Sequence, residues 1–399
     1  MKILFKFILL YCIAIIPAGI FARDVNLDAI YVNNSALSNN LKNLKLSAYS
    51  SARSIFVSDD VAFAHWIKRD EIVFVKEEDD SASIFSYKLN GSRTLICSVP
   101  GVVTVFRPSS SGKYLYLKTI ENVNGKPLSS FITVDVEKSA FTKKSSSFPF
   151  LDFTISHRHD AYISFDGNDF VEVTPTGSLQ KILNIKEFSA ITSSNLQQTF
   201  LLYSPNNKNK LIFSGSGANY KSIVLGANGN STFGGLSSSS EIFWIDNGRI
   251  LFRTGHVGNF GVTLFNYNTD SSRTLLDNSL NTNICFSPVS RIASFVDNQL
   301  INIYDVSKNS ITNIGLEGED VYFSPNGLHF TSLLYKKLYI SRLDNVRKHR
   351  DEILSYSNDI INIYSRILEN KSFWQNDFTP EYCKRKISAY RRLVVADKN

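Results

Sequence analysis

Short apolar segments separated by polar turns make up most of the chain between residues 61 and 342. The segments are four to eight residues long and rich in β-branched and aromatic side chains, and Asn, Gly, Ser or Asp bound them. Such segments are typical of β-strands, because these side chains fit a pleated backbone and the flanking residues favour turns. The pattern therefore predicts an all-β region that covers most of the chain.

The strand pattern repeats. The stretch NICFSPVSRIASFVDNQLINIYDV at 283–306 and the stretch DVYFSPNGLHFTSLLYKKLYISRLD at 320–344 both run strand, Phe-Ser-Pro, turn, strand, turn, strand. FSYKLNGSRTLI at 85–96 matches FNYNTDSSRTLL at 265–276, 180 residues later, and VDVEKSAFT at 134–142 matches YDVSKNSIT at 304–312, 170 residues later. If each spacing holds four repeats, one unit has about 40–45 residues, which is the length of a four-stranded propeller blade.

Division on this period gives six units of four strands and a seventh of three, at Val321–Ser324, Phe330–Leu334 and Leu338–Arg342. An open last blade would expose unpaired strand edges. The stretch ARSIFVSD, Ala52 to Asp59, supplies a strand at the other end of the repeats. The sequence therefore predicts a seven-bladed β-propeller closed by this N-terminal strand.

The fourth unit is the least regular. Its strands are expected at Ala190–Ser194, Thr199–Tyr203, Leu211–Ser214 and Lys221–Leu225. Because the pattern is ragged between residues 184 and 240, six or eight blades remain open as alternatives.

The sequences CFSPVSRIASFVDNQLINIYDV and YFSPNGLHFTSLLYKKLYISRLD resemble the repeat of TolB-like and WD-repeat-like β-propellers. In that repeat one strand ends in Phe-Ser-Pro-Asp-Gly and two more strands follow. Val289 and Asn326 stand where the repeat usually has Asp, and no separate αβ domain like that of TolB precedes the repeats. The resemblance covers about Ala52 to Arg342 and implies the propeller fold, without naming a ligand.

The N-terminus has the pattern of a secretory signal peptide. Lys2 and Lys6 precede an apolar run at Ile8–Ile16, a Pro-Ala-Gly breaker follows, and cleavage is expected after Ala22. The alternative is a retained membrane anchor. We therefore expect an exported protein with a signal peptide at 1–22, a lead segment at 23–51, the propeller at 52–343 and a helical basic tail at 344–399. Deletion of residues 23–40 is expected to have little effect on stability.

The C-terminal tail has a helical period. One apolar face comprises Ile353, Ser357, Ile360, Tyr364 and Ile367. A second helix is expected to start at Thr379-Pro380, with Cys383, Ile387, Tyr390 and Val394 on its apolar face and Lys384, Arg385, Arg391 and Arg392 on another side. Two interpretations stay open: a tail packed on the propeller with a solvated basic face, or a docking element for an acidic partner or the anionic lipids of an envelope.

The net charge is concentrated in that tail. The whole chain carries +7, and from Ser341 onward twelve Lys or Arg face eight Asp or Glu. Without Lys2 and Lys6 of the signal peptide and without this tail, the rest of the chain is nearly neutral, which argues against a nucleic-acid-binding surface. Cys97, Cys285 and Cys383 remain after signal cleavage, and this odd number favours unpaired buried thiols over one disulfide with a thiol left over.

Motifs for chemistry are weak. The chain has no Gly-x-Ser-x-Gly nucleophile motif and no Gly-rich phosphate loop. His157 and His159 in SHRHD are the best metal candidates, but the repeats place them at a turn; KEEDD at 76–80 is expected at a hairpin tip, and SFDGNDF at 164–170 is one residue short of the Asp-box turn of sialidases. We therefore expect no metal and no cofactor.

The leading functional hypothesis is an exported, non-catalytic propeller that binds a protein or peptide on one face of the ring. Loops between second and third strands are the expected contact sites, at Glu77–Ala82, Glu121–Pro127 and His256–Phe260. The candidate contact residues are Glu78, Asp79, Lys126, His256 and Phe260. A hydrolase or lyase that uses residues of the central funnel, and an envelope-assembly component, are the alternatives.

Overall fold

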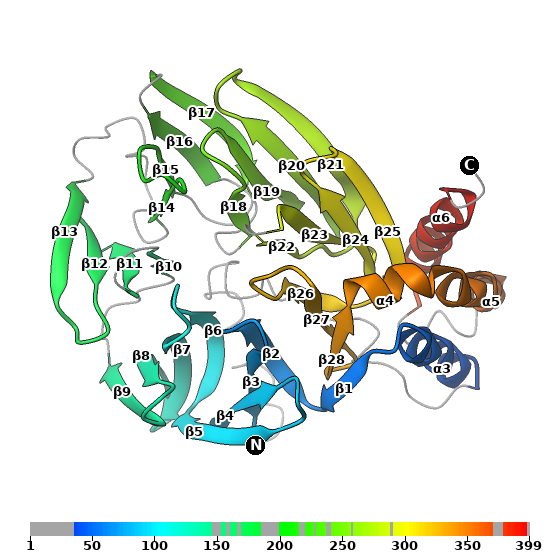
Figure 1. Cartoon of the computed structure of the whole chain (residues 1–399), viewed down its shortest axis with the longest axis horizontal. Helices are drawn as coiled ribbons and strands as arrows, with labels where there is room; N and C mark the ends of the chain where they lie inside the picture. Colours follow the sequence, from blue (N-terminus) through cyan, green and yellow to red (C-terminus); the bar gives the residue numbers. More distant parts are fainter. Residues whose placement is uncertain are drawn as a thin grey trace.

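The computed structural model of the protein describes residues 36–145, 153–156, 160–165, 169–184, 199–214, 220–226, 229–236, 241–256, 258–287, 290–369 and 378–396. Its strands form seven blades arranged as a ring, with the first strand of each blade nearest the centre (Figure 1). The predicted seven-bladed propeller is confirmed. Within the described helices, none has the length and apolar character needed to cross a bilayer.

Each blade has four antiparallel strands that follow one another in the chain, except in blade 7, and a single pairing of Leu236 with Thr254 joins blades 4 and 5 into one eight-stranded sheet. Blade 1 consists of β2 (Val61–Trp66), β3 (Glu71–Glu77), β4 (Ser81–Lys88) and β5 (Arg93–Pro100). Blade 2 consists of β6 (Val102–Pro108), β7 (Tyr114–Val123), β8 (Lys126–Asp135) and β9 (Ala140–Ser145). Blade 3 consists of β10 (Thr154–Ile155), β11 (Tyr162–Phe165), β12 (Asp169–Val173) and β13 (Leu179–Asn184). Blades 4 and 5 are β14 (Thr199–Tyr203), β15 (Lys210–Ser214), β16 (Tyr220–Gly226) and β17 (Gly229–Leu236); and β18 (Ile242–Trp244), β19 (Arg249–His256), β20 (Asn259–Asn266) and β21 (Ser271–Ser279). Blades 6 and 7 are β22 (Ile284–Ser287), β23 (Ile292–Asp297), β24 (Leu300–Asp305) and β25 (Ser310–Glu317); and β26 (Glu319–Phe323), β27 (His329–Leu334), β28 (Lys337–Arg342) and β1 (Ile55–Ser58).

The core lies between neighbouring blades. In β3 the residues Ile72, Val73, Phe74 and Val75 are all fully buried, because both faces of a blade pack against other blades. This explains why the middle strands are continuous apolar runs rather than alternating ones. The outer strands, such as β13, are more exposed and more polar.

The predicted closure is confirmed. β1 pairs antiparallel with β28, with Ile55 opposite Ile340 and Phe56 opposite Tyr339. Ile55 and Phe56 remain 40% and 52% exposed, so only Val57 of β1 packs into the core beside β28. The closure therefore depends on its backbone ladder and on one apolar side chain.

The predicted strands of the fourth blade are shifted by one. Thr199–Tyr203 is the first strand of that blade and not the second, and Gly229–Leu236 is its fourth. The sequence analysis missed this last strand because Gly229, Gly234 and Gly235 give it the composition of a loop. The expected strand at Ala190–Ser194 lies outside the described residues.

Helices pack at the edge of the ring beside blades 6 and 7 (Figure 1). We call α3 (Ala36–Ser51), α5 (Arg350–Glu369) and α6 (Pro380–Ala396) the helical layer; the short α4 (Leu343–Lys348) joins β28 to it. The helical tail is thus confirmed, and the apolar face expected for α5 is buried at all five positions. The helix in the lead segment was not predicted, because Asn, Ser and Lys interrupt its apolar positions.

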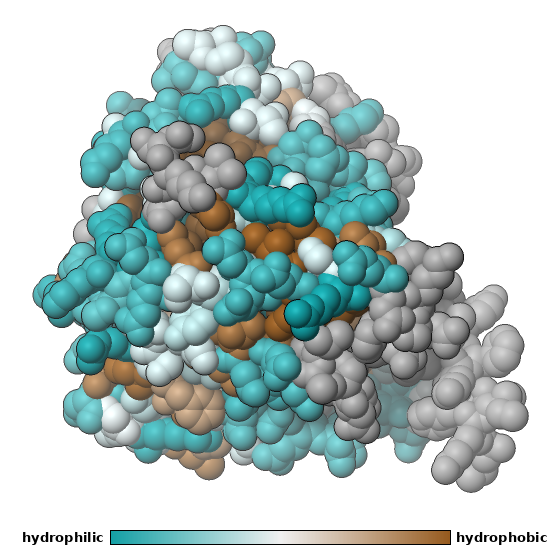
Figure 2. Space-filling model, turned by 90° about the vertical axis from the view of Figure 1, so that its right-hand side faces the viewer, coloured by the Kyte–Doolittle hydropathy of each residue, from teal (hydrophilic) through white to brown (hydrophobic). Residues whose placement is uncertain are grey.

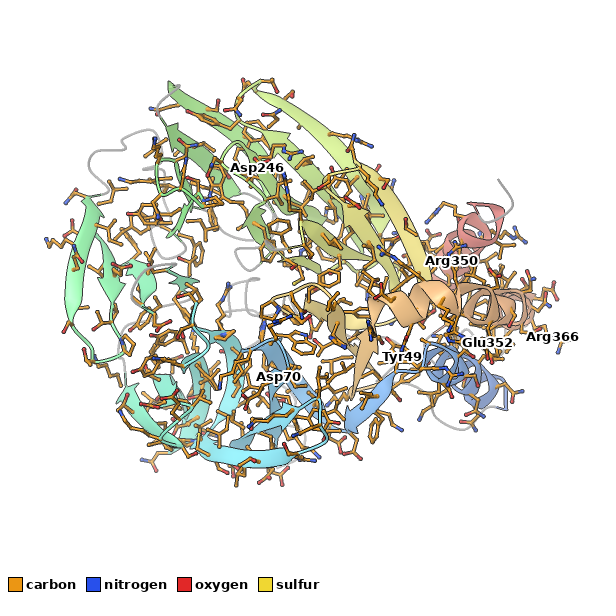
Figure 3. All side chains as sticks on the ribbon, in the orientation of Figure 1. Tyr49, Asp70, Asp246, Arg350, Glu352 and Arg366 are labelled. Atoms are coloured by element: carbon orange, nitrogen blue, oxygen red, sulfur yellow. The ribbon has the colours of Figure 1, made fainter. Side chains whose placement is uncertain are left out.

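Tyr49 of α3 is inserted between blades 6 and 7 and is 1% exposed. Its hydroxyl donates to the backbone carbonyl oxygen of Glu317 in β25 at 2.6 Å and lies 2.7 Å from the Ser332 hydroxyl in β27. Its ring lies 4.5 Å from that of Tyr339 in β28 (Figure 3). The lead segment therefore forms part of the ring's core.

A buried ion cluster attaches both ends of the chain to blade 6. The Glu317 carboxylate accepts from Lys45 of α3 at 2.7 Å and from Lys386 of α6 at 2.6 Å, and all three side chains are at most 1% exposed. Lys386 also donates to the Asn298 carbonyl oxygen and the Gln299 side chain. Because removal of one partner leaves a buried charge without compensation, this cluster makes the helices and blade 6 interdependent.

Candidate binding surfaces

The hairpins between second and third strands lie on one face of the ring. Because successive strands are antiparallel, the same face also carries the links from the fourth strand of one blade to the first strand of the next. We call it the hairpin face. All the expected contact residues of the propeller belong to it.

At blades 1 and 2 this face has tight, exposed hairpins in place of the expected longer loops. Asn124 and Gly125 alone connect β7 to β8, and both have positive φ, 54° and 77°, as a two-residue hairpin turn requires. Lys126 follows this turn and is exposed. Glu78 and Asp79 lie at the β3–β4 hairpin and are exposed as well.

Further carboxylates surround the β3–β4 hairpin. Val61 pairs with Lys76, which brings Asp59 and Asp60 beside that hairpin. Lys76 lies 3.2 Å from Asp59, and this hydrogen bond lowers the pKa of the Asp59 carboxyl. With Glu77–Asp80, the surface at blade 1 therefore carries six carboxylates, and we call it the acidic tip; its neighbouring lysines include Lys76 and Lys337, which both lower the pKa of Asp59.

The blade 5 hairpin differs, because α6 is bound to it. Arg385 donates to the carbonyl oxygen of Gly258 at 2.7 Å and to that of Asn278 at 3.1 Å. His256 is exposed, but Phe260 is only 4% exposed and lies under the Arg253 guanidinium, 4.5 Å from its centre. The expectation that Phe260 offers an aromatic contact is therefore wrong: its ring packs within blade 5.

The four basic residues expected on one side of α6 divide into two pairs. Arg385 and Arg392 contact the propeller, since Arg392 lies 2.8 Å from the Asp297 carboxylate. Lys384 and Arg391 point away from the ring and are exposed, and within the described part of the chain neither pairs with a carboxylate. Docking on the propeller and an exposed basic surface thus coexist on one helix.

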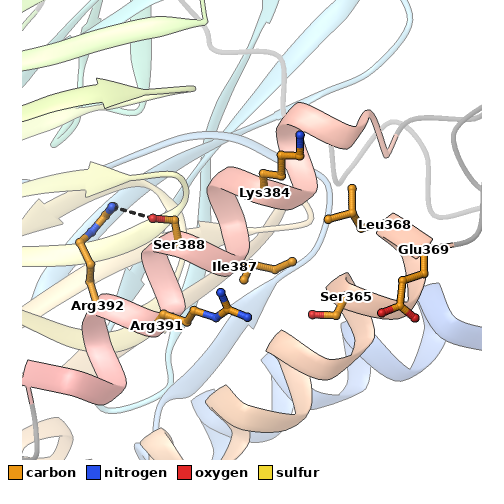
Figure 4. A pocket seen from close by; sticks show the side chains of 8 residues that line it. All are labelled: Ser365, Leu368, Glu369, Lys384, Ile387, Ser388, Arg391 and Arg392. Atoms are coloured by element: carbon orange, nitrogen blue, oxygen red, sulfur yellow. Dashed lines mark hydrogen bonds between the residues drawn. The ribbon is translucent and has the colours of Figure 1, made fainter.

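Lys384 and Arg391 flank a groove of about 640 Å³ between α5 and α6. Leu368 and Ile387 provide its apolar floor, and the Arg391 side chain extends from α6 toward α5 (Figure 4). Ser365, Glu369, Ser388 and Arg392 complete the lining. A view onto this side of the molecule shows apolar surface between hydrophilic side chains (Figure 2).

A row of polar and aromatic side chains on the inner strands was missed by the sequence analysis. The His65 ring of β2 lies 3.9 Å from the Tyr322 ring of β26 and 5.7 Å from the Phe106 ring of β6. Near Tyr322, the Asn283 amide donates to the Asp320 carboxylate at 3.1 Å. No sequence motif could reveal this row, because its members come from blades 1, 2 and 7 and from the link before β22.

The protonation of this row suits binding better than acid–base chemistry. Burial, and secondly the Arg107 guanidinium, lower the pKa of His65 to about 3. Burial also raises the pKa of the Tyr322 hydroxyl, and the Asp320 carboxylate adds to this effect. At neutral pH both groups are uncharged, and an imidazole with so low a pKa is a weak general base.

The remaining sequence candidates offer little chemistry. Cys97, Cys285 and Cys383 form no disulfide, and burial raises the pKa of Cys97 to about 11 and of Cys285 to about 12. His157, His159 and the middle of SFDGNDF lie outside the described residues. In the ranges that are described, no three His, Cys, Asp or Glu side chains form a group suited to a metal ion.

Comparison with known proteins supports the fold and goes no further. No protein-family model and no curated protein matches the chain. A chain of the mitotic checkpoint complex matches with a TM-score of 0.50 and 12% identity, covering 73% of this chain and 90% of that one. An oligogalacturonate lyase in complex with manganese has a TM-score of 0.48 and 10% identity, and the match covers 74% of this chain and 98% of that one. The WD40 propeller domain of Doa1 has a TM-score of 0.47 and 12% identity, and the match covers 73% of this chain and 97% of that one. At such identities the likeness shows the propeller fold alone.

Proposed function

We propose that this chain is an exported, non-catalytic propeller that binds a protein or peptide at the hairpin face of blades 1 and 2. One observation carries the proposal: Glu78, Asp79 and Lys126 are exposed on hairpins to which no described helix is bound, whereas α6 is bound to the hairpin of blade 5. Rigid hairpins on a packed ring are suited to recognition, because little conformational entropy is lost when a partner binds.

The acidic tip indicates the chemistry of the partner. Six carboxylates outnumber the neighbouring lysines Lys76 and Lys337, and the resulting negative potential attracts a basic segment and accelerates its association. Lys126 on the neighbouring blade adds one positive contact at the border. We therefore propose a partner with a lysine- or arginine-rich segment.

Affinity capture from the native envelope and secretome tests this proposal. A Glu78→Lys/Asp79→Lys variant should lower the capture of a specific partner at least about tenfold relative to the unmodified protein, because it reverses two contact charges. The matched control is Asp70→Lys/Glu137→Lys, which makes the same charge change on exposed turns of the opposite face. Equal capture by both variants would place the site elsewhere.

Export has a separate test. N-terminal sequencing of the native protein should find a chain that begins near Arg23, because an apolar run followed by small residues precedes Arg23. A chain that begins at Met1 in a cytoplasmic fraction would contradict export and leave the binding proposal to be judged by the capture experiment.

A further inference from the structure

We infer that the groove between α5 and α6 is a docking surface for an anionic phospholipid bilayer. The inference is independent of the partner proposed for blades 1 and 2, because the groove belongs to the helical layer and not to the hairpin face. It rests on three features: the position of the groove in the layer, the charges that flank it, and its apolar floor.

The groove opens toward the end of the layer where the N-terminal segment joins it. Ser51 of α3 donates to Glu352 at the start of α5, and Asn40 lines a second groove with Arg366 near the end of α5, so the two helices are antiparallel. The 35 residues before α3 therefore connect at the same end as Leu368 and Glu369 of the groove. That segment contains the apolar run Ile8–Ile16, which would hold this end of the layer near a membrane for as long as the proposed signal peptide is attached.

The charges at this end favour an anionic surface. Lys384 and Arg391 are seven residues apart, so they lie two turns apart on the same side of α6. Arg366 is exposed at the outer end of α5, away from the ring (Figure 3). Among the residues that the structure describes, none of these three cations pairs with a carboxylate, although Glu369 lines the same groove.

The apolar floor distinguishes the groove from an ordinary basic surface. Leu368 is partly exposed and lies between the cations, and Ile387, which is 6% exposed, forms the bottom of the groove beside it. A basic margin around an apolar strip is the arrangement by which amphipathic helices associate with bilayers, where the cations meet headgroup phosphates and the apolar side chains enter the acyl boundary. An acidic protein segment would satisfy the cations alone.

Vesicle co-sedimentation of the full chain tests the inference. The protein should bind phosphatidylcholine vesicles that contain 25% phosphatidylglycerol more tightly than pure phosphatidylcholine vesicles, and salt should weaken this difference. Lys384→Gln/Arg391→Gln should lower affinity for the anionic vesicles about 25-fold, at about fivefold for each cation. The control Arg347→Gln/Lys348→Gln removes two exposed cations from α4 and should change the affinity for the anionic vesicles less than about threefold.

Three results would overturn the inference. Equal binding to neutral and anionic vesicles would assign membrane contact to the N-terminal apolar run. An equal loss of affinity for anionic vesicles in both double variants would show that binding responds only to the net charge of the protein. Binding to a soluble polyglutamate peptide that depends on Lys384 and Arg391, without binding to anionic vesicles, would assign the groove to an acidic protein.

Discussion

Blades 1 and 2 and blades 6 and 7 are built from the same repeat, but they are stabilised differently. Blades 1 and 2 are made of consecutive strands, and their core consists of side chains from those strands and their neighbours. Blade 7 joins Ile55 to Ile340, 285 positions apart, and the core between blades 6 and 7 contains Ala48 and Tyr49 of the lead segment and the adjoining Ala52.

This difference follows from the topology of a closed ring. A blade of consecutive strands is closed by short hairpins, whereas the final blade must bring together the two ends of the chain at a larger cost in conformational entropy. The β1 ladder is short and contributes one buried apolar side chain. The helical layer adds apolar contacts and buried ions where the ring would otherwise be weakest.

The largest expected difference between the two regions concerns their acidic residues. Glu317→Ala should lower the free energy of unfolding by about 4 kcal/mol, because it leaves the buried Lys45 and Lys386 ammonium groups without their carboxylate. Glu121→Ala in blade 2 removes a more exposed pair with Lys143 and should cost less than about 1 kcal/mol. Guanidinium denaturation measures both values, and similar losses would remove the distinction between the two regions.

The pH dependence of the free energy of unfolding tests the packing between blade 1 and blade 7. The pKa of His65 is about 3 in the fold against 6.5 in the unfolded chain, so the unfolded state binds the proton first as the pH falls. The stability that neutral His65 contributes is present above pH 6.5 and decreases below it, by about 2 kcal/mol between pH 7 and pH 5. Denaturation curves at the two pH values should show this loss, and His65→Phe should reduce it; an unchanged loss in the variant would assign it to other groups.

The hydroxyl of Tyr49 should have a smaller effect. Tyr49→Phe keeps the inserted ring but removes the hydrogen bonds to Glu317 and Ser332, and it should cost about 1–2 kcal/mol. Tyr114→Phe in blade 2 is the matched control, with an expected change below about 0.5 kcal/mol, because its hydroxyl makes no hydrogen bond within the described residues. Equal changes in the free energy of unfolding for the two variants would mean that α3 stabilises the fold through its apolar contacts only.

The smallest expected effect is at the closure strand itself. Phe56→Ala should cost less than about 1 kcal/mol, because the ring is half exposed and contacts only the surface of blade 7. Phe74→Ala in the middle of blade 1 should cost about 3–5 kcal/mol, because its side chain is fully buried. A large loss at Phe56 would show that the closure depends on side-chain packing and not on its backbone ladder.

Some of the candidate surface could be predicted from residue order and some could not. The exposed hairpin positions of Glu78, Asp79 and Lys126 follow from the turn pattern alone. The burial of Phe260 and the contacts of the four basic residues of α6 do not follow from the turn pattern, because they depend on which blade the helix contacts. Lys386 was passed over, although its position between Cys383 and Tyr390 on the apolar side of α6 is a readable signal of burial.

The sequence by itself determined the repeat unit, the seven blades and the closing strand. It could do so because strand periodicity and turn residues are local properties, and because a ring leaves only one place for an unpaired strand. It also determined the amphipathic faces of α5 and α6, whose apolar positions follow a helical period.

Only the tertiary structure decided the role of the lead segment. Lys45, Lys386 and Glu317 lie in three distant parts of the chain, and nothing in the sequence around any one of them identifies the other two as its partners. Their burial becomes favourable only when the two ends of the chain meet at blade 6, because opposite charges in a low-dielectric interior compensate one another at contact distance and not through sequence proximity.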